Sequence, residues 1–70
     1  MSSYFVEKTE LLNGDHEVHI DGCHHMPMET NRTYVGEFNH CIEAIEEAKS
    51  IYPTANGCFS CCETGHSVFG

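Results

Sequence analysis

The sequence has few basic residues, with three Lys and Arg against eleven Asp and Glu, which gives a formal net charge of −8. Nonspecific affinity for nucleic acid comes from cations that neutralise the phosphate backbone, so this balance disfavours DNA or RNA as the main partner. An acidic surface favours solubility and suits a basic protein partner. We therefore expect a protein partner, and we keep nucleic acid only as an alternative.

Long apolar runs are also missing. No stretch approaches the roughly 18 apolar residues that a membrane span needs, and the segment Met1–Tyr4 has neither the basic region nor the apolar run of a signal peptide. We expect a monomeric cytoplasmic protein without membrane attachment. In that compartment thiols stay reduced, and clustered cysteines more often bind a metal than form disulfides. The odd number of cysteines, five, also fits a closed set of disulfides badly.

The common catalytic patterns are absent as well. The sequence has no Ser-His-Asp ordering, no glycine loop that could cradle a phosphate and no paired catalytic carboxylates. It also has no internal repeat, low-complexity segment or interdomain linker, so we expect a single domain over residues 1–70 that is not an enzyme. A chain of this length buries only about 60% of its unfolded surface. Such domains usually need disulfides, a metal or a partner subunit for stability.

Local patterns predict a small α+β domain with an N-terminal β-hairpin, a short third strand, one amphipathic helix and a C-terminal Cys-x-x-Cys knuckle. Residues 4–11 and 17–20 have the β-branched and aromatic composition of strands. The Asn13-Gly14 pair between them is a strong turn signal. Residues 32–35 predict the third strand.

The helix is predicted to begin after Asn39, a favourable N-cap residue, and to end before Pro53. At about 100° per residue, this segment has one apolar and one acidic face, the pattern of a helix that packs on a core. The apolar face consists of Cys41, Ala44, Ile45, Ala48, Ile51 and Tyr52. Cys41 is therefore expected to be a small buried core residue.

The clearest chemical motif is the Cys-x-x-Cys formed by Cys58 and Cys61. Two residues between the thiolates let a tight turn direct both sulfurs at one tetrahedral ion. The preceding Asn56-Gly57 predicts another turn, for which the glycine supplies backbone freedom. A second half-site, His19-x3-Cys23, ends the predicted hairpin. Together the two half-sites form a closed set of zinc ligands, which is typical of a structural rather than a catalytic site because no coordination position stays open.

Several alternatives remain open at this point. His66 lies five residues after Cys61 and competes with His19 as the histidine ligand. Cys62 is either a spare thiol beside the site or a buried residue. With Cys58 and Cys61 it also allows a thiol-redox or metal-handling protein that forms a reversible disulfide.

The order of these motifs resembles the Ada-type zinc-binding domain, which is the metal-binding module of a DNA-methyl-repair protein and of small relatives appended to bacterial nucleases. The resemblance covers about residues 17–62. It includes His19-x3-Cys23, the strand-like run Arg32–Phe38, a helix with the pair Glu43-Ala44, and Cys58-x2-Cys61.

This resemblance implies a treble-clef-like or Ada-like fold and a Zn²⁺ cofactor. The implied metal ligands are His19, Cys23, Cys58 and Cys61. It also implies, as an alternative function, an accessory nucleic-acid-associated domain of a DNA-processing system. Ada itself uses four cysteines, so a histidine at position 19 and the acidic surface argue against methyl transfer. We expect a structural zinc-binding module that serves as a protein-interaction or accessory domain.

Overall fold

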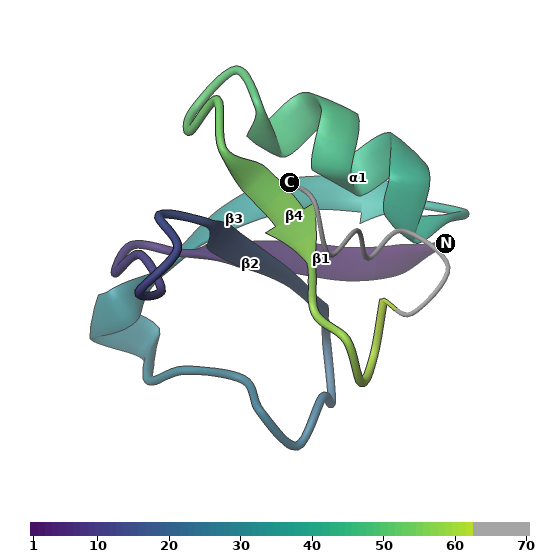
Figure 1. The fold of residues 1–70 in the computed structure, drawn as a ribbon. Coiled ribbons are helices and arrows are strands. Elements are labelled where there is room, and N and C mark those ends of the chain that lie inside the picture. The colour runs from purple at the N-terminus through teal and green to yellow at the C-terminus, as the bar shows by residue number, and fades with distance from the viewer. Residues whose placement is uncertain (63–70) are drawn as a thin grey trace.

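The computed structural model describes residues 1–62 and shows a four-stranded mixed sheet with one α-helix (Figure 1). The elements are β1 (Ser2–Glu7), β2 (His16–Ile20), the 3-10 helix η1 (Glu29–Asn31), β3 (Arg32–Phe38), α1 (Cys41–Ala48) and β4 (Ala55–Gly57). The strand order is β3-β1-β2-β4. α1 lies across one face of the sheet, and the segment that joins β2 to β3 passes on the other side. The predicted α+β class is confirmed.

β1 and β2 form the predicted antiparallel hairpin, with Phe5 opposite His19 and Val6 opposite Val18. β1 ends earlier than predicted, because the chain leaves the sheet after Glu7, the last residue paired with β3. Residues 8–15 therefore form a loop between the two strands. β3 is longer than the short strand predicted and pairs with β1 along its length, apart from one irregularity.

β4 is the element that the sequence pattern misses. The turn predicted at Asn56-Gly57 is wrong, since both residues belong to a strand that runs parallel to β2. Cys58 N–H extends this ladder by donating to the backbone oxygen of Val18 at 3.0 Å. Asn56 is buried and donates its side-chain amide to Asp15 Oδ2 at 3.2 Å. Gly57 has no positive φ, so it is an ordinary strand residue and does not use the conformational freedom of glycine.

The hydrophobic core lies between α1 and the sheet. Val6 and Val18 are completely buried, and α1 packs Ala44 and Ile45 against them. The cluster consists of Tyr4, Val6, Val18, Cys41, Ala44, Ile45, Ala48, Ala55 and Cys62. The predicted apolar face of the helix is confirmed as far as Ala48.

The ends of α1 differ slightly from the prediction. His40, not Asn39, is the N-cap, because Glu43 reaches back and accepts the His40 backbone N–H at 3.2 Å in a capping box. The helix ends at Ala48, so Ile51 is 43% exposed instead of continuing the apolar face. Over residues 1–62, no helix has the length and apolar character that crossing a membrane requires.

Cys41 and Cys62 form a disulfide, with their Cα atoms 5.6 Å apart. This corrects the expectation that all thiols stay reduced. Cys41 is a buried core residue, as predicted, but it is disulfide-bonded and not free. Cys62 is a buried residue bonded to the start of α1, and not a spare thiol. The pairing leaves three free cysteines, Cys23, Cys58 and Cys61. Three is an odd number, so disulfides within the chain cannot pair all of these cysteines.

Candidate metal centre

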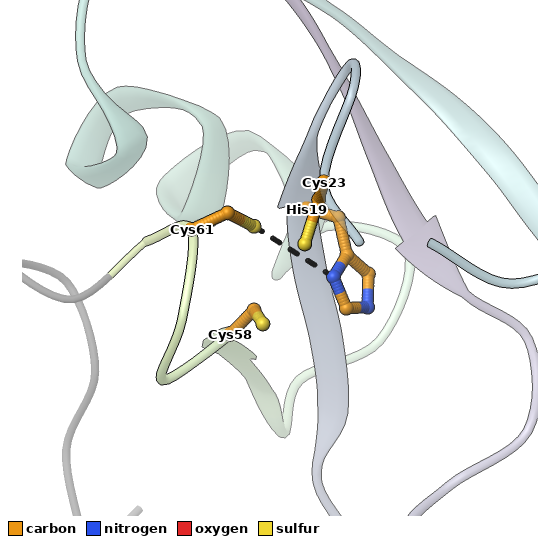
Figure 2. A group of neighbouring side chains, drawn as sticks. All are labelled: His19, Cys23, Cys58 and Cys61. Carbon is orange, nitrogen blue, oxygen red and sulfur yellow. Dashed lines mark hydrogen bonds between the residues drawn. The ribbon is translucent and has the colours of Figure 1, made fainter. Parts of the chain in front are cut away.

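Four side chains from two distant segments meet at one point beside β2 (Figure 2). His19 lies on β2 and Cys23 follows that strand, whereas Cys58 and Cys61 follow β4. One ring nitrogen of His19 and the three sulfurs all lie within 4.8 Å of one another. The structure thus brings together the four residues that the sequence predicts as metal ligands, in a group that could hold a metal ion.

The alternation of β2 explains why His19 faces this site. Val18 and Ile20 contact the core under α1, so the residue between them points to the opposite face of the sheet. His19 is nevertheless completely buried. The chain after Ile20 then turns so that the Cys23 sulfur lies near the His19 ring.

The two ring nitrogens of His19 have different neighbours. Nε2 lies 2.8 Å from Glu7 Oε1, and Nδ1 lies 3.8 Å from Cys61 Sγ (dashed line in Figure 2). An ionised carboxylate only accepts hydrogen bonds, so Nε2 carries the proton. In the neutral ring, Nδ1 then presents its lone pair to the sulfurs and to any metal among them.

Cys23 and Cys58 lie in turns with the same hydrogen-bond pattern. Each sulfur accepts the backbone N–H of the residue two positions later, which is His25 for Cys23 and Ser60 for Cys58, both at 3.4 Å. Gly22 enters the first turn with φ +92°, a conformation that other residues rarely adopt. Backbone N–H groups thus point at both sulfurs in the same way.

The Cys61 thiol is perturbed by its burial and by its neighbours. Its sulfur accepts the backbone N–H of Ile20 at 3.4 Å. Burial, followed by the neighbouring Cys23 and Cys58, nevertheless raises the pKa of the Cys61 thiol to about 12. A bound divalent cation would oppose this effect, because its larger local charge stabilises a neighbouring thiolate.

Two carboxylates near the site carry no sequence signal. Glu7 and Glu17 form a second group with His19, in which all three donor atoms lie within 4.8 Å of one another. Glu7 lies on the neighbouring strand, and only the register of β1 and β2 brings it to His19. The competing ligand His66 falls outside residues 1–62 and is not described by the structure.

The basic side chains are largely engaged within the protein. Lys49 Nζ lies 3.9 Å from Glu46 Oε1 at the end of α1. The Arg32 guanidinium lies 4.8 Å from the centroid of the Phe5 ring. Both cations thus have a neighbour in the chain, although the Lys49–Glu46 pair is solvent-exposed and weak.

Comparison with known proteins adds no family to these observations. No protein-family model matches the chain, and no curated protein or solved structure is significantly similar to it. The function is therefore argued from the chemistry of the site.

Proposed function

We propose that this chain is a structural zinc-binding module, in which one Zn²⁺ bound by His19, Cys23, Cys58 and Cys61 stabilises the fold. The proposal rests on the convergence of four side chains that could bind one metal ion. His19 and Cys23 precede β3 and α1 in the sequence, whereas Cys58 and Cys61 follow them. Such a site links the chain after β2 to the chain after β4.

The donor chemistry favours zinc, and one distance between donor atoms agrees with it. Thiolate and imidazole are the ligands of structural zinc sites, with Zn–S near 2.3 Å and Zn–N near 2.0–2.1 Å in a tetrahedron. These lengths place sulfur and nitrogen about 3.6 Å apart across the ion. The observed 3.8 Å between Cys61 Sγ and His19 Nδ1 is close to that value.

The segment over the site needs such a link. None of residues 21–31 is buried, so this segment gains little from the hydrophobic core. A side-chain bond near its far end, from Arg32 Nη1 to the Pro27 oxygen at 3.0 Å, is partly exposed. A metal bond through Cys23 is the strongest interaction available to hold the segment against the sheet.

The role we propose is binding rather than catalysis. Four protein ligands fill a tetrahedral zinc site, which leaves no position for a substrate or an activated water. The acidic surface suits a basic protein partner. On the motif order we group the chain with Ada-type zinc modules, as a protein-interaction or accessory domain without methyl transfer.

The test is native mass spectrometry of the full chain as purified, followed by chelation and a ¹H–¹⁵N NMR spectrum. We expect one zinc per chain and the loss of dispersed amide signals when it is removed. Cys23→Ser should abolish zinc binding. The matched control, Cys41→Ser with Cys62→Ser, removes cysteines outside the ligand set and should keep one zinc. A metal-free protein that retains its dispersed spectrum would contradict the proposal.

A further inference from the structure

Glu7 lies behind His19, on the side away from the sulfurs. Figure 2 shows the second ring nitrogen of His19 pointing away from the three cysteines. Glu7 Oε1 meets this nitrogen at 2.8 Å, a short hydrogen bond between a completely buried ring and a carboxylate that is only 16% exposed. The imidazole is therefore held between the carboxylate and the sulfurs.

The sheet register determines that Glu7 can reach this position. Phe5 is opposite His19, and Glu7 is two residues further along β1, so its side chain emerges on the same face. Glu17 is two residues before His19 on β2 and also shares that face. Its Oε1 is 3.9 Å from the same nitrogen, beyond hydrogen-bond range. Of the two carboxylates, only Glu7 bonds the ring.

The cation opposite Glu7 on β3 does not compete for its carboxylate. Arg32 is its partner on β3, which would normally favour a cross-strand ion pair. The Arg32 guanidinium instead lies over the Phe5 ring and donates to the Pro27 oxygen. Among residues 1–62, the Glu7 carboxylate pairs with the His19 ring and forms no ion pair with a Lys or Arg side chain.

The backbone of Glu7 is also fixed. His16 donates its Nδ1–H to the Glu7 backbone oxygen at 2.9 Å. The His16 ring in turn stacks on Tyr52, with 3.8 Å between centroids and 6° between the ring planes. Glu7 is thus held at its main chain by one histidine while its side chain orients another.

We propose that Glu7 is a positioning residue of the metal centre, which accepts the Nε2–H of His19 and so presents Nδ1 to the metal. This inference rests on the proposed function. Metal-binding histidines generally donate their other N–H to such an acceptor, which fixes the tautomer and the ring orientation and makes the ligand more basic. The proton stays on Nε2, and the metal takes the Nδ1 lone pair.

The experiment compares Glu7→Ala and Glu7→Gln with Glu17→Ala in the zinc-loaded full chain. Glu17 is the matched control, since it is the same residue type on the same face with nearly the same exposure, 15%. Zinc affinity is measured by competition with a chromophoric chelator. Glu7→Ala should weaken binding about 10- to 100-fold. Glu7→Gln keeps an acceptor oxygen and should fall between Glu7→Ala and the wild type, whereas Glu17→Ala should match the wild type.

A second readout separates positioning from general destabilisation. Long-range ¹H–¹⁵N spectra of the His19 ring report which nitrogen carries the proton. In the zinc-loaded wild type we expect Nε2 protonated and Nδ1 bound to metal. In Glu7→Gln the Nε2–H signal should shift because its hydrogen bond is weaker, and this readout remains if Glu7→Ala fails to fold.

Each outcome decides between the two proposals. Wild-type protein that binds no zinc refutes the proposed function itself. Zinc bound through Nε2, or Glu7 variants with unchanged affinity and ring spectra, overturns the role of Glu7 and leaves the zinc module intact. A loss in Glu17→Ala equal to that in Glu7→Ala would also overturn it, because the effect would then come from nearby negative charge and not from the hydrogen bond.

Discussion

The two faces of the sheet are stabilised in different ways. On the α1 face, apolar side chains such as Val18 and Ile45 pack together, and a disulfide ties the start of the helix to the chain after β4. On the opposite face, the central buried side chain is His19, a polar residue surrounded by sulfurs and the Glu7 carboxylate. One face is held by burial of apolar surface, and the other offers donors for a cation.

This difference shows how a short chain covers both sides of a sheet. A single helix of eight residues supplies one apolar layer. The chain has no second α-helix within residues 1–62, and the segment 21–31, which holds only the short 3-10 helix η1, contributes no buried side chain to the opposite layer. A few metal–ligand bonds contribute a large free energy of folding, so a metal ion can hold a segment that buries little apolar surface.

Removal of the metal should have the largest effect. A structural zinc site contributes about 10–16 kcal/mol at neutral pH, whereas the whole stability of a domain is about 5–15 kcal/mol. We expect chelation to unfold the chain, with residues 21–31 losing amide dispersion at the lowest chelator concentration. Two-dimensional NMR during the titration measures this order, and added zinc should restore the spectrum. If the α1 face lost its structure first, the proposal that the metal stabilises mainly the opposite face would be wrong.

A core substitution under α1 should have the next largest effect. Ile45→Ala removes a buried side chain and should cost about 2–5 kcal/mol in the free energy of unfolding of the zinc-loaded protein. Because Ile45 is not one of the four donors and His19 lies on the other face, the protein should still bind one zinc. Ile42→Ala is the control on the same helix, since Ile42 is 56% exposed and its loss should cost at most about 0.5 kcal/mol. Urea denaturation gives both values, and loss of zinc from Ile45→Ala would show that the two faces are coupled.

Loss of the disulfide should cost somewhat less. The bond between Cys41 and Cys62 closes a loop with a sequence separation of 21, which corresponds to about 3 kcal/mol from the restricted unfolded chain. The double variant Cys41→Ser with Cys62→Ser should lose about this much in urea denaturation at saturating zinc. Its zinc affinity should stay near that of the wild type. A large drop in affinity would mean that Cys62 helps to place its neighbour Cys61.

The sequence predicts well the features that depend on local spacing. The helical period identifies the buried face of α1, and the half-sites His19-x3-Cys23 and Cys58-x2-Cys61 each place donors within a single turn. These patterns require only neighbouring residues to adopt ordinary local geometry. Their convergence in the structure depends on the parallel pairing of β4 with β2, which no local pattern predicts.

The features that the sequence misses depend on contacts between distant segments. A three-residue strand such as β4 has no periodic pattern and exists because β2 offers it a parallel partner. The disulfide requires Cys62 to reach the start of α1, which no spacing rule reveals. The position of Glu7 behind His19 likewise depends on the strand register. Such facts require the tertiary structure.

The smallest effect should come from two glycines with nearly the same backbone conformation. Gly22 has φ +92° and precedes Cys23, whereas Gly14 has φ +90° and lies in the loop between β1 and β2. A Cβ at Gly22 would meet no atom within 4 Å, and one at Gly14 would only touch Glu10 at 3.9 Å. Either change to alanine should therefore cost about 1–2 kcal/mol through backbone strain alone.

Zinc affinity should separate these two variants, although their stabilities are similar. Strain at Gly22 acts directly on the turn that aims the Cys23 sulfur, so Gly22→Ala should weaken zinc binding by up to about tenfold, the equivalent of 1.4 kcal/mol. Gly14→Ala strains a turn away from the ligands and should leave zinc affinity unchanged in the same chelator competition. Equal losses of affinity in both variants would show that the metal responds to the stability of the whole domain, and not to the geometry of the segment it holds.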